Sequence, residues 1–193
     1  MRSMPIHRLT KRLFLLGLCG VLTACMVVRK PSETELRALD HPPSAVQAKL
    51  DRFYPLTLAW YEEVECQLLA QGRMLSNQEK ALAQRLGVKF PENVRIVVLE
   101  KFPMPSNHEL ATEAEKLGLG GALEGGRAMG YAIMLKPKLA DNPTVIAHEL
   151  VHVAQHDRLG REAFLRRYLA ELEMMGYARS PLELEAYARQ SAR

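Results

Sequence analysis

The sequence predicts an α+β fold in which most of the chain is helical and a small sheet packs among the helices. Three observations lead to this expectation. Apolar residues recur at helical spacing between residues 44 and 71. The short stretches 94–99 and 131–135 are bounded by turn signals and rich in aliphatic residues, as is typical of strands. Asn142 followed by Pro143 is a strong helix start, and the apolar residues after it should bury that helix on most sides.

Capping residues and glycines delimit the other elements. We expect helices over residues 76–87, 107–117, 142–159 and 162–175, and from residue 180 onward. The pair Gly125-Gly126 stands between short apolar runs and is expected to form a tight hairpin turn. The strand 131–135 would then return from that turn.

The first residues have the layout of a bacterial lipoprotein signal peptide. A basic stretch up to Arg12 precedes an apolar run over residues 13–22, which is too short to span a bilayer. The tetrapeptide Leu22-Thr23-Ala24-Cys25 resembles a lipobox, whose cysteine is acylated and becomes the first residue of the mature protein. We therefore expect lipidation at Cys25 and a bacterial lipoprotein of the outer membrane that faces the periplasm.

The expected organisation is a signal peptide over 1–24, a polar tether over 25–43 and one domain over 44–193. The formal net charge of the 193 residues is +4, but the signal peptide holds four basic residues and no acid. The remainder is therefore neutral, which argues against nucleic acid as a partner. Cys66 has no intrachain partner once Cys19 is removed and Cys25 is acylated, and we expect it to be a buried, unreactive thiol.

The helix expected after Asn142 carries the sequence His148-Glu149-Leu150-Val151-His152. Residues four apart on an α-helix point ~40° apart and lie one turn apart, so both imidazoles can reach one metal ion. Glu149 points beside that pair, where its carboxylate can serve as a general base without being a ligand. Burying two imidazoles and a carboxylate among aliphatic residues is unfavourable unless a metal or hydrogen bonds satisfy them. The pattern predicts the His-Glu-x-x-His site of zinc peptidases.

A catalytic zinc ion needs a third protein ligand from elsewhere in the chain. His156 lies about 12 Å along the helix from the first motif histidine, so we expect it behind the site or at the surface. On the last predicted helix, Glu183 and Glu185 point ~200° apart, and only one of them can face the metal. Glu183 is the favoured ligand, although it could instead close a capping box with Ser180. Glu185, the rival ligand, could instead form an exposed ion pair.

Residues 94–193 resemble the gluzincin clan of metallopeptidases, and most closely the minigluzincins. In that clan a downstream helix supplies a glutamate, followed three residues later by alanine and then by a polar residue. Glu183, Ala186 and Tyr187 match this spacing, with Tyr187 at the position where aspartate or asparagine usually holds a metal histidine. The resemblance implies a compact zincin-like core over 94–193, preceded by a helical part over 44–90, and a zinc ion held by His148, His152 and Glu183.

The resemblance also implies a zinc-dependent peptidase of the cell envelope, with Glu149 as general base. An edge strand just before the metal-binding helix, at 131–135, would bind an extended peptide or protein substrate by strand addition. The donor that stabilises the oxyanion stays open among Tyr168, Tyr177, Tyr187 and His156. The alternative is a catalytically inactive, zinc-stabilised module that binds envelope components. In either case, the membrane is a partner through the lipid at Cys25.

Overall fold

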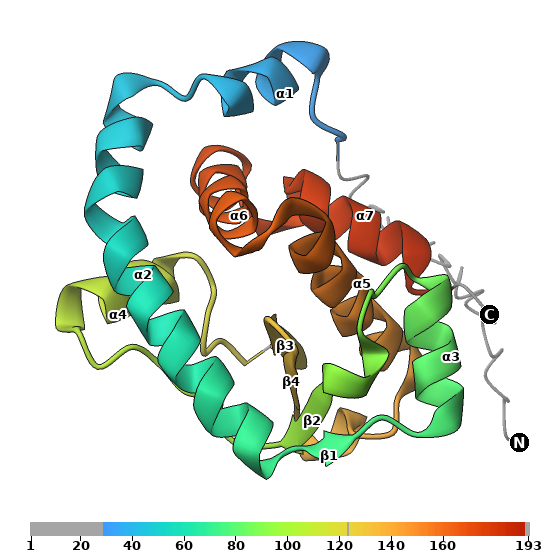
Figure 1. Ribbon diagram of the computed structural model, residues 1–193. Coiled ribbons are helices and arrows are strands. Elements are labelled where there is room, and N and C mark those ends of the chain that lie inside the picture. Colours follow the sequence, from blue (N-terminus) through green and yellow to red (C-terminus); the bar gives the residue numbers. More distant parts are fainter. Residues whose placement is uncertain (1–28, 123, 192–193) are drawn as a thin grey trace, which may run out of the picture.

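The computed structural model describes residues 29–122 and 124–191 and confirms the α+β class (Figure 1). The helices are α1 (Glu33–Asp40), α2 (Ser44–Gln71), α3 (Asn77–Arg85), α4 (His108–Lys116), α5 (Pro143–Leu159), α6 (Arg161–Met175) and α7 (Pro181–Arg189). The strands are β1 (Arg73–Met74), β2 (Arg95–Val98), β3 (Gly126–Met129) and β4 (Ala132–Leu135). Along the described residues, no helix combines the length and the apolar character that crossing a bilayer requires.

The sheet has the order β1-β2-β4-β3, with β2 and β4 parallel and the other pairs antiparallel. It lies between α2 on one face and α5 on the other (Figure 1). Ile133 and Leu135 pack with α5, whereas Ala132 and Met134 pack with α2, as the alternation of side chains along a strand requires. Because β4 is buried on both faces, all four of its residues are apolar and buried.

Two expectations about the sheet are wrong. The hairpin between β3 and β4 turns at Gly130 and Tyr131, and Gly126 is the first residue of β3, so Gly125-Gly126 is not the turn. The strand that precedes α5 directly, β4, lies inside the sheet, and the edge position belongs to β3. The stretch 131–135 therefore presents no free edge.

Contacts from α2 fix this hairpin. Gly130 adopts a φ of +60°, a left-handed conformation that favours glycine. Its N–H donates to the Tyr61 hydroxyl, and the N–H of Tyr131 donates to Glu65 Oε1 at 2.9 Å. A β-carbon at position 130 would overlap that same Glu65 oxygen, so only glycine fits.

The stretch 33–40, which lies within the expected tether, forms the helix α1. Ser32 and Glu35 form a capping box that opens α1, and Leu39 is buried with Leu50 of α2 and Ala170 of α6. Glu35 also pairs with Arg179 at 2.6 Å, which ties α1 to the segment before α7. The expected signal peptide and the expected lipidation site Cys25 lie outside the described residues.

Cys66 is exposed, so the expectation of a buried thiol is wrong. The buried face of α2 is formed by Tyr61, Val64 and Leu68, which recur at helical spacing. Cys66 lies between these positions and points outward. Elsewhere, the helices end close to the expected residues, including α5, which begins after Asn142 and ends before Gly160.

Substituting Gly130 by alanine tests how the hairpin is held. Gly118→Ala is the matched control, because Gly118 also has a positive φ but a β-carbon added there would meet no atom within 4 Å. The control should lower the free energy of unfolding by about 1–2 kcal/mol through backbone strain alone. Gly130→Ala should lose about 1–3 kcal/mol more, because Glu65 must give up its hydrogen bond. Urea unfolding of both variants measures the difference, and equal losses would contradict this account of the hairpin.

Candidate metal centre

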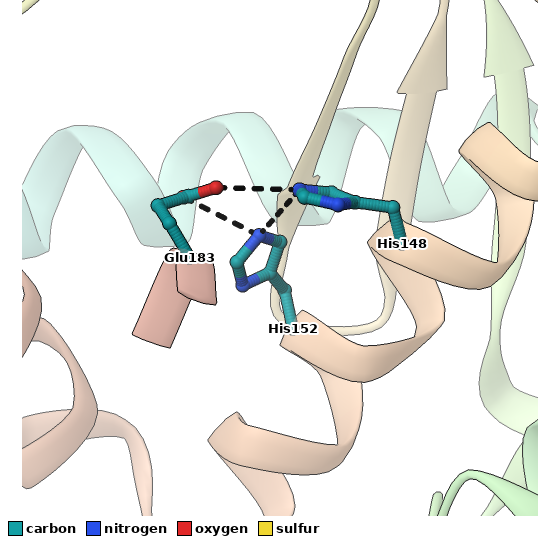
Figure 2. A group of neighbouring side chains, drawn as sticks. All are labelled: His148, His152 and Glu183. Atoms are coloured by element: carbon teal, nitrogen blue, oxygen red, sulfur yellow. Dashed lines mark hydrogen bonds and ion pairs between the residues drawn. The ribbon is translucent and has the colours of Figure 1, made fainter. Parts of the chain in front are cut away.

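The structure brings His148 and His152 of α5 together with Glu183 of α7. One ligand atom of each residue lies within 4.8 Å of the others, and Figure 2 shows the three side chains pointing toward one another. The two Nε2 atoms are 3.2 Å apart, and the Glu183 oxygens lie 3.3 Å and 3.4 Å from the Nε2 atoms of His148 and His152. All three residues are buried. They form a group that could hold a metal ion.

The helix that carries the two histidines is locked in the core. Asn142 caps its N-terminus by accepting from the N–H groups of Thr144 and Val145 at 3.0 Å and 3.3 Å. Every residue from Ile146 to His156 is buried, and Leu150 and Val151 are fully so. A one-residue shift of α5 would disrupt this packing, so the positions of the two imidazoles are well defined.

Two glutamines orient the imidazole rings, and sequence reasoning missed both. The Nδ1 of His152 lies 2.8 Å from Gln155 Oε1, and the Nδ1 of His148 lies 3.1 Å from Gln190 Oε1. Because an amide oxygen only accepts, each Nδ1 donates in these contacts, and in the neutral ring the Nε2 lone pair is then free for a ligand. Gln155 is fully buried and also donates to the Leu182 carbonyl at 2.9 Å, which links the ring to α7.

Glu183 is positioned by the start of α7. The Ser180 hydroxyl accepts from the Glu183 N–H at 3.3 Å and donates to Glu171 Oε2 at 2.7 Å. Glu171 is itself buried and also accepts from the Leu182 N–H at 2.9 Å. The Glu183 carboxylate does not turn back to close the capping box with Ser180. It reaches the two imidazoles and accepts from the Tyr168 hydroxyl at 2.7 Å.

Glu185, the rival third ligand, does not join the group. Its carboxylate accepts from the Arg158 guanidinium at 2.9 Å and 2.8 Å and from Arg189 at 3.0 Å. The paired guanidinium contacts lower the pKa of Glu185 to about 2. The geometry therefore matches the expectation that Glu183, and not Glu185, faces the histidines.

The three side chains fit a divalent cation. Glu183 Oε2 is buried and has no hydrogen-bond partner, which is unfavourable for a carboxylate oxygen unless a positive charge satisfies it. When both imidazoles are neutral and carry their protons on Nδ1, the two Nε2 lone pairs point at the same place and repel one another, and a cation between them removes this repulsion. Two imidazoles and one carboxylate are a donor set that suits zinc and related first-row metals.

In the absence of a metal, the group attracts protons. Burial disfavours a charged imidazole at His152, but hydrogen bonding and proximity to Glu183 outweigh it and raise the pKa of His152 to about 9. Burial raises the pKa of Glu183, yet the neighbouring imidazoles of His148 and His152 outweigh it and hold this pKa well below the ordinary range. A metal ion that binds here must displace the proton from His152.

Glu149 lies beside the group without belonging to it. It is buried, and together with His148, His152 and Glu183 it lines a cavity of about 800 Å³. Burial raises the pKa of Glu149 above its ordinary value, while the two histidines oppose that rise. The side chain packs against the edge strand, since a β-carbon at Gly126 would lie only 2.5 Å from Glu149 Oε1.

The structure separates the four candidate oxyanion donors. The Tyr168 hydroxyl is engaged by Glu183, whereas Tyr177 and Tyr187 line the cavity with their hydroxyls 3.5 Å apart. His156 does not line the cavity. It is buried among Tyr61, Tyr131 and Phe164 with both ring nitrogens unpartnered, which excludes the surface and leaves the other expected position, behind the site.

The resemblance implied that the residue at position 187 holds a metal histidine by a hydrogen bond. Tyr187 makes no such bond to His148. Its ring meets the His148 ring edge-on, with centroids 4.7 Å apart. Gln190, three residues further along, supplies the hydrogen bond instead. The sequence holds a weak signal that Gln190 could take the place of Tyr187, because these residues are three apart and therefore lie on the same face of the helix.

No protein-family model matches the chain, and no curated protein or solved structure matches it. The interpretation of the site therefore depends on its own geometry.

Replacing each acidic candidate separately tests the ligand set. Glu183→Ala should abolish stoichiometric zinc binding, because it removes one of the three ligands and leaves only the two histidines to hold the ion. Glu185→Ala is the matched control on the same helix and should retain one zinc ion per chain, since its partners are arginines. Metal analysis of both purified proteins after dialysis measures the difference. Zinc retention by Glu183→Ala would exclude this ligand set.

Proposed function

We propose that the protein is a zinc-dependent peptidase of the gluzincin type. The observation that carries the proposal is the placement of Glu149 on the wall of a cavity, directly beside three buried ligand atoms from His148, His152 and Glu183. A ligand group alone would suit a structural metal. A buried carboxylate that is adjacent to the group but not part of it is what amide hydrolysis additionally requires.

The residues have distinct roles in this proposal. Zinc, when bound, supplies a Lewis acid that polarises the scissile carbonyl and makes water more acidic. Glu149 accepts a proton from the attacking water and later delivers it to the leaving amine. Tyr177 and Tyr187 carry hydroxyls that line the same cavity and could donate to the oxyanion.

The edge strand β3 offers a place for an extended substrate. The Lys136 N–H donates to the Gly125 carbonyl at 3.0 Å, so strand alternation directs the backbone groups of Gly126 and Ala128 away from β4. Both residues line the cavity, and Gly126 adjoins Glu149. A peptide added to this edge would bring its backbone next to the general base, with affinity that depends little on sequence.

The alternative function is an inactive, zinc-stabilised module that binds envelope components. A structural zinc site is closed by four protein ligands, whereas a catalytic site keeps one position open for water. In residues 29–122 and 124–191, the group contains three potential ligands and no fourth His, Cys, Asp or Glu. This count supports the peptidase over the inert module.

We also propose that Cys25 carries a lipid that anchors the protein to the bacterial outer membrane on its periplasmic side.

Glu149→Gln separates catalysis from metal binding. The amide keeps the size of the side chain but cannot accept a proton, so zinc should stay at one ion per chain while turnover falls by about 10²–10⁴-fold. Cleavage of casein and of a mixed peptide library, with and without a chelator, provides the assay. Full activity in this variant would remove the mechanism, and an inert wild type with a tightly held zinc would favour the binding module.

Gly126→Ala tests the contact between the edge strand and the general base. The added methyl group must displace the Glu149 carboxylate, and a shift of about 1 Å can lower the rate about 10²-fold. Zinc binding should persist, because no ligand is touched. Gly125→Ala is the neighbouring control, since its methyl group meets only the flexible end of Leu139. Equal activity of the two variants would show that the Gly126 contact does not position Glu149.

A further inference from the structure

The cavity beside the metal group extends far beyond what amide hydrolysis needs. Its volume is about 800 Å³, whereas a water molecule occupies about 30 Å³ in the liquid. Most of its wall away from the metal group is apolar and comes from α2, α4 and α6, with representative residues Leu50, Phe53, Leu110, Leu165 and Leu169.

The cavity is elongated along these helices. On α2 its lining runs from Lys49 to Tyr61, which corresponds to about 18 Å of helix. On α6 it runs from Phe164, near the metal-binding helix, to Glu173. One end thus meets the ligand group and Glu149, and the other lies between the first turns of α2 and the last turns of α6.

The polarity of the wall decides what can fill it. The N–H and C=O groups within α2, α4 and α6 are already paired inside their helices. The charged side chains at the far end, Lys49, Glu113 and Glu173, are paired with one another, so these walls offer few free partners to a ligand. A buried polypeptide main chain would leave its own amides unpaired, and each unpaired amide is strongly unfavourable. A hydrocarbon chain has no such groups and gains from leaving water.

We infer that the cavity holds a long acyl chain, so that the substrates are peptides that carry a fatty acyl group. This inference rests on the proposed peptidase function. The peptide part lies along β3, and the acyl chain runs between α2 and α6. The reaction is ordinary hydrolysis: the amide C–N bond breaks, the hydroxyl of water adds to the carbonyl carbon, and the remaining proton goes to the nitrogen.

Two buried donors mark where the acyl chain would join the peptide. Trp60 Nε1 and Arg127 Nη2 both belong to cavity-lining residues and have no hydrogen-bond partner. The Arg127 side chain is nine-tenths buried, lies within 5.9 Å of the Trp60 ring and is neutralised by Glu124 at 2.7 Å. These donors could bind the carbonyl at the root of an acyl chain. Arg127 follows Gly126 on β3 and its side chain lies on the opposite face from Glu149, so this carbonyl would lie across the free edge of β3 from the scissile bond.

A binding experiment tests the cavity without requiring catalysis. Full-length protein with Cys25→Ser, which removes the expected acylation, is titrated in detergent-free buffer with a dansylated undecanoic acid. Its fluorescence should rise on binding, and dodecanoate should displace it far better than hexanoate, with Kd falling by up to about fourfold per added methylene. The same dependence is expected of fatty acids and of acyl-peptides, because the chain is shared. Absence of binding, or affinity that does not depend on chain length, would overturn the inference.

Paired substitutions on α4 locate the binding. Ala114 lines the cavity, whereas Ala111 on the same helix does not. Ala114→Phe should weaken dodecanoate binding at least tenfold, and Ala111→Phe should leave it unchanged. Because α4 carries no metal ligand, zinc stoichiometry should be normal in both variants, which also reports that they fold. Equal affinity in the two variants would place the fatty acid elsewhere and overturn the inference.

A turnover experiment separates this inference from the proposed function. Peptide libraries that differ only in an acetyl, hexanoyl or dodecanoyl group are compared, and kcat/KM should rise with chain length in the wild type but not in Ala114→Phe. Equal cleavage of all libraries would leave the peptidase in place and overturn the acyl-chain inference. Binding of dodecanoate without cleavage of any library would support the cavity assignment and remove the peptidase.

Discussion

Burial of the segment from His148 to His152 is the constraint on which the rest of the structure depends. The hydrophobic core encloses α5 on nearly every side, so its two imidazoles can be satisfied only by groups that the fold brings to them. Gln155 and Gln190 engage the outer ring nitrogens, and Glu183 faces the inner ones. The acidic ligand is in turn held by a buried network through Ser180 and Glu171, so the start of α7 is built around the metal group.

Much of the fold could be predicted because the helix signals are local. Three such signals each act within about one helical turn: the helix start at Asn142-Pro143, the capping box of Ser76 with Glu79, and the helix stop at Gly160. The structure places a helix end at each of them. The pair of histidines was equally accessible, because helical spacing alone puts residues four apart on one face. The choice of Glu183 over Glu185 also matched, since the two point to opposite sides of α7.

What the sequence could not provide depends on contacts between distant segments. The hairpin turns at Gly130 because Tyr61 and Glu65 of α2 bind the backbone there. No local sequence pattern distinguishes Gly130 from the other glycines that precede it. Strand order likewise depends on packing, so the edge position of β3 was missed. Gln190 acquires its role only when α7 lies against α5. Tyr187 was the more visible residue in the sequence but makes a ring contact instead.

The most direct test of the central claim is X-ray absorption of the zinc-loaded protein. The account predicts four light scatterers at about 2.0–2.1 Å, with the outer-shell pattern of two imidazoles, one carboxylate oxygen and one solvent oxygen. Addition of a hydroxamate should replace the solvent and leave the imidazole pattern unchanged. A spectrum with sulfur at about 2.3 Å, or with fewer than two imidazoles, would contradict it. A folded protein that takes up no zinc would contradict it as well.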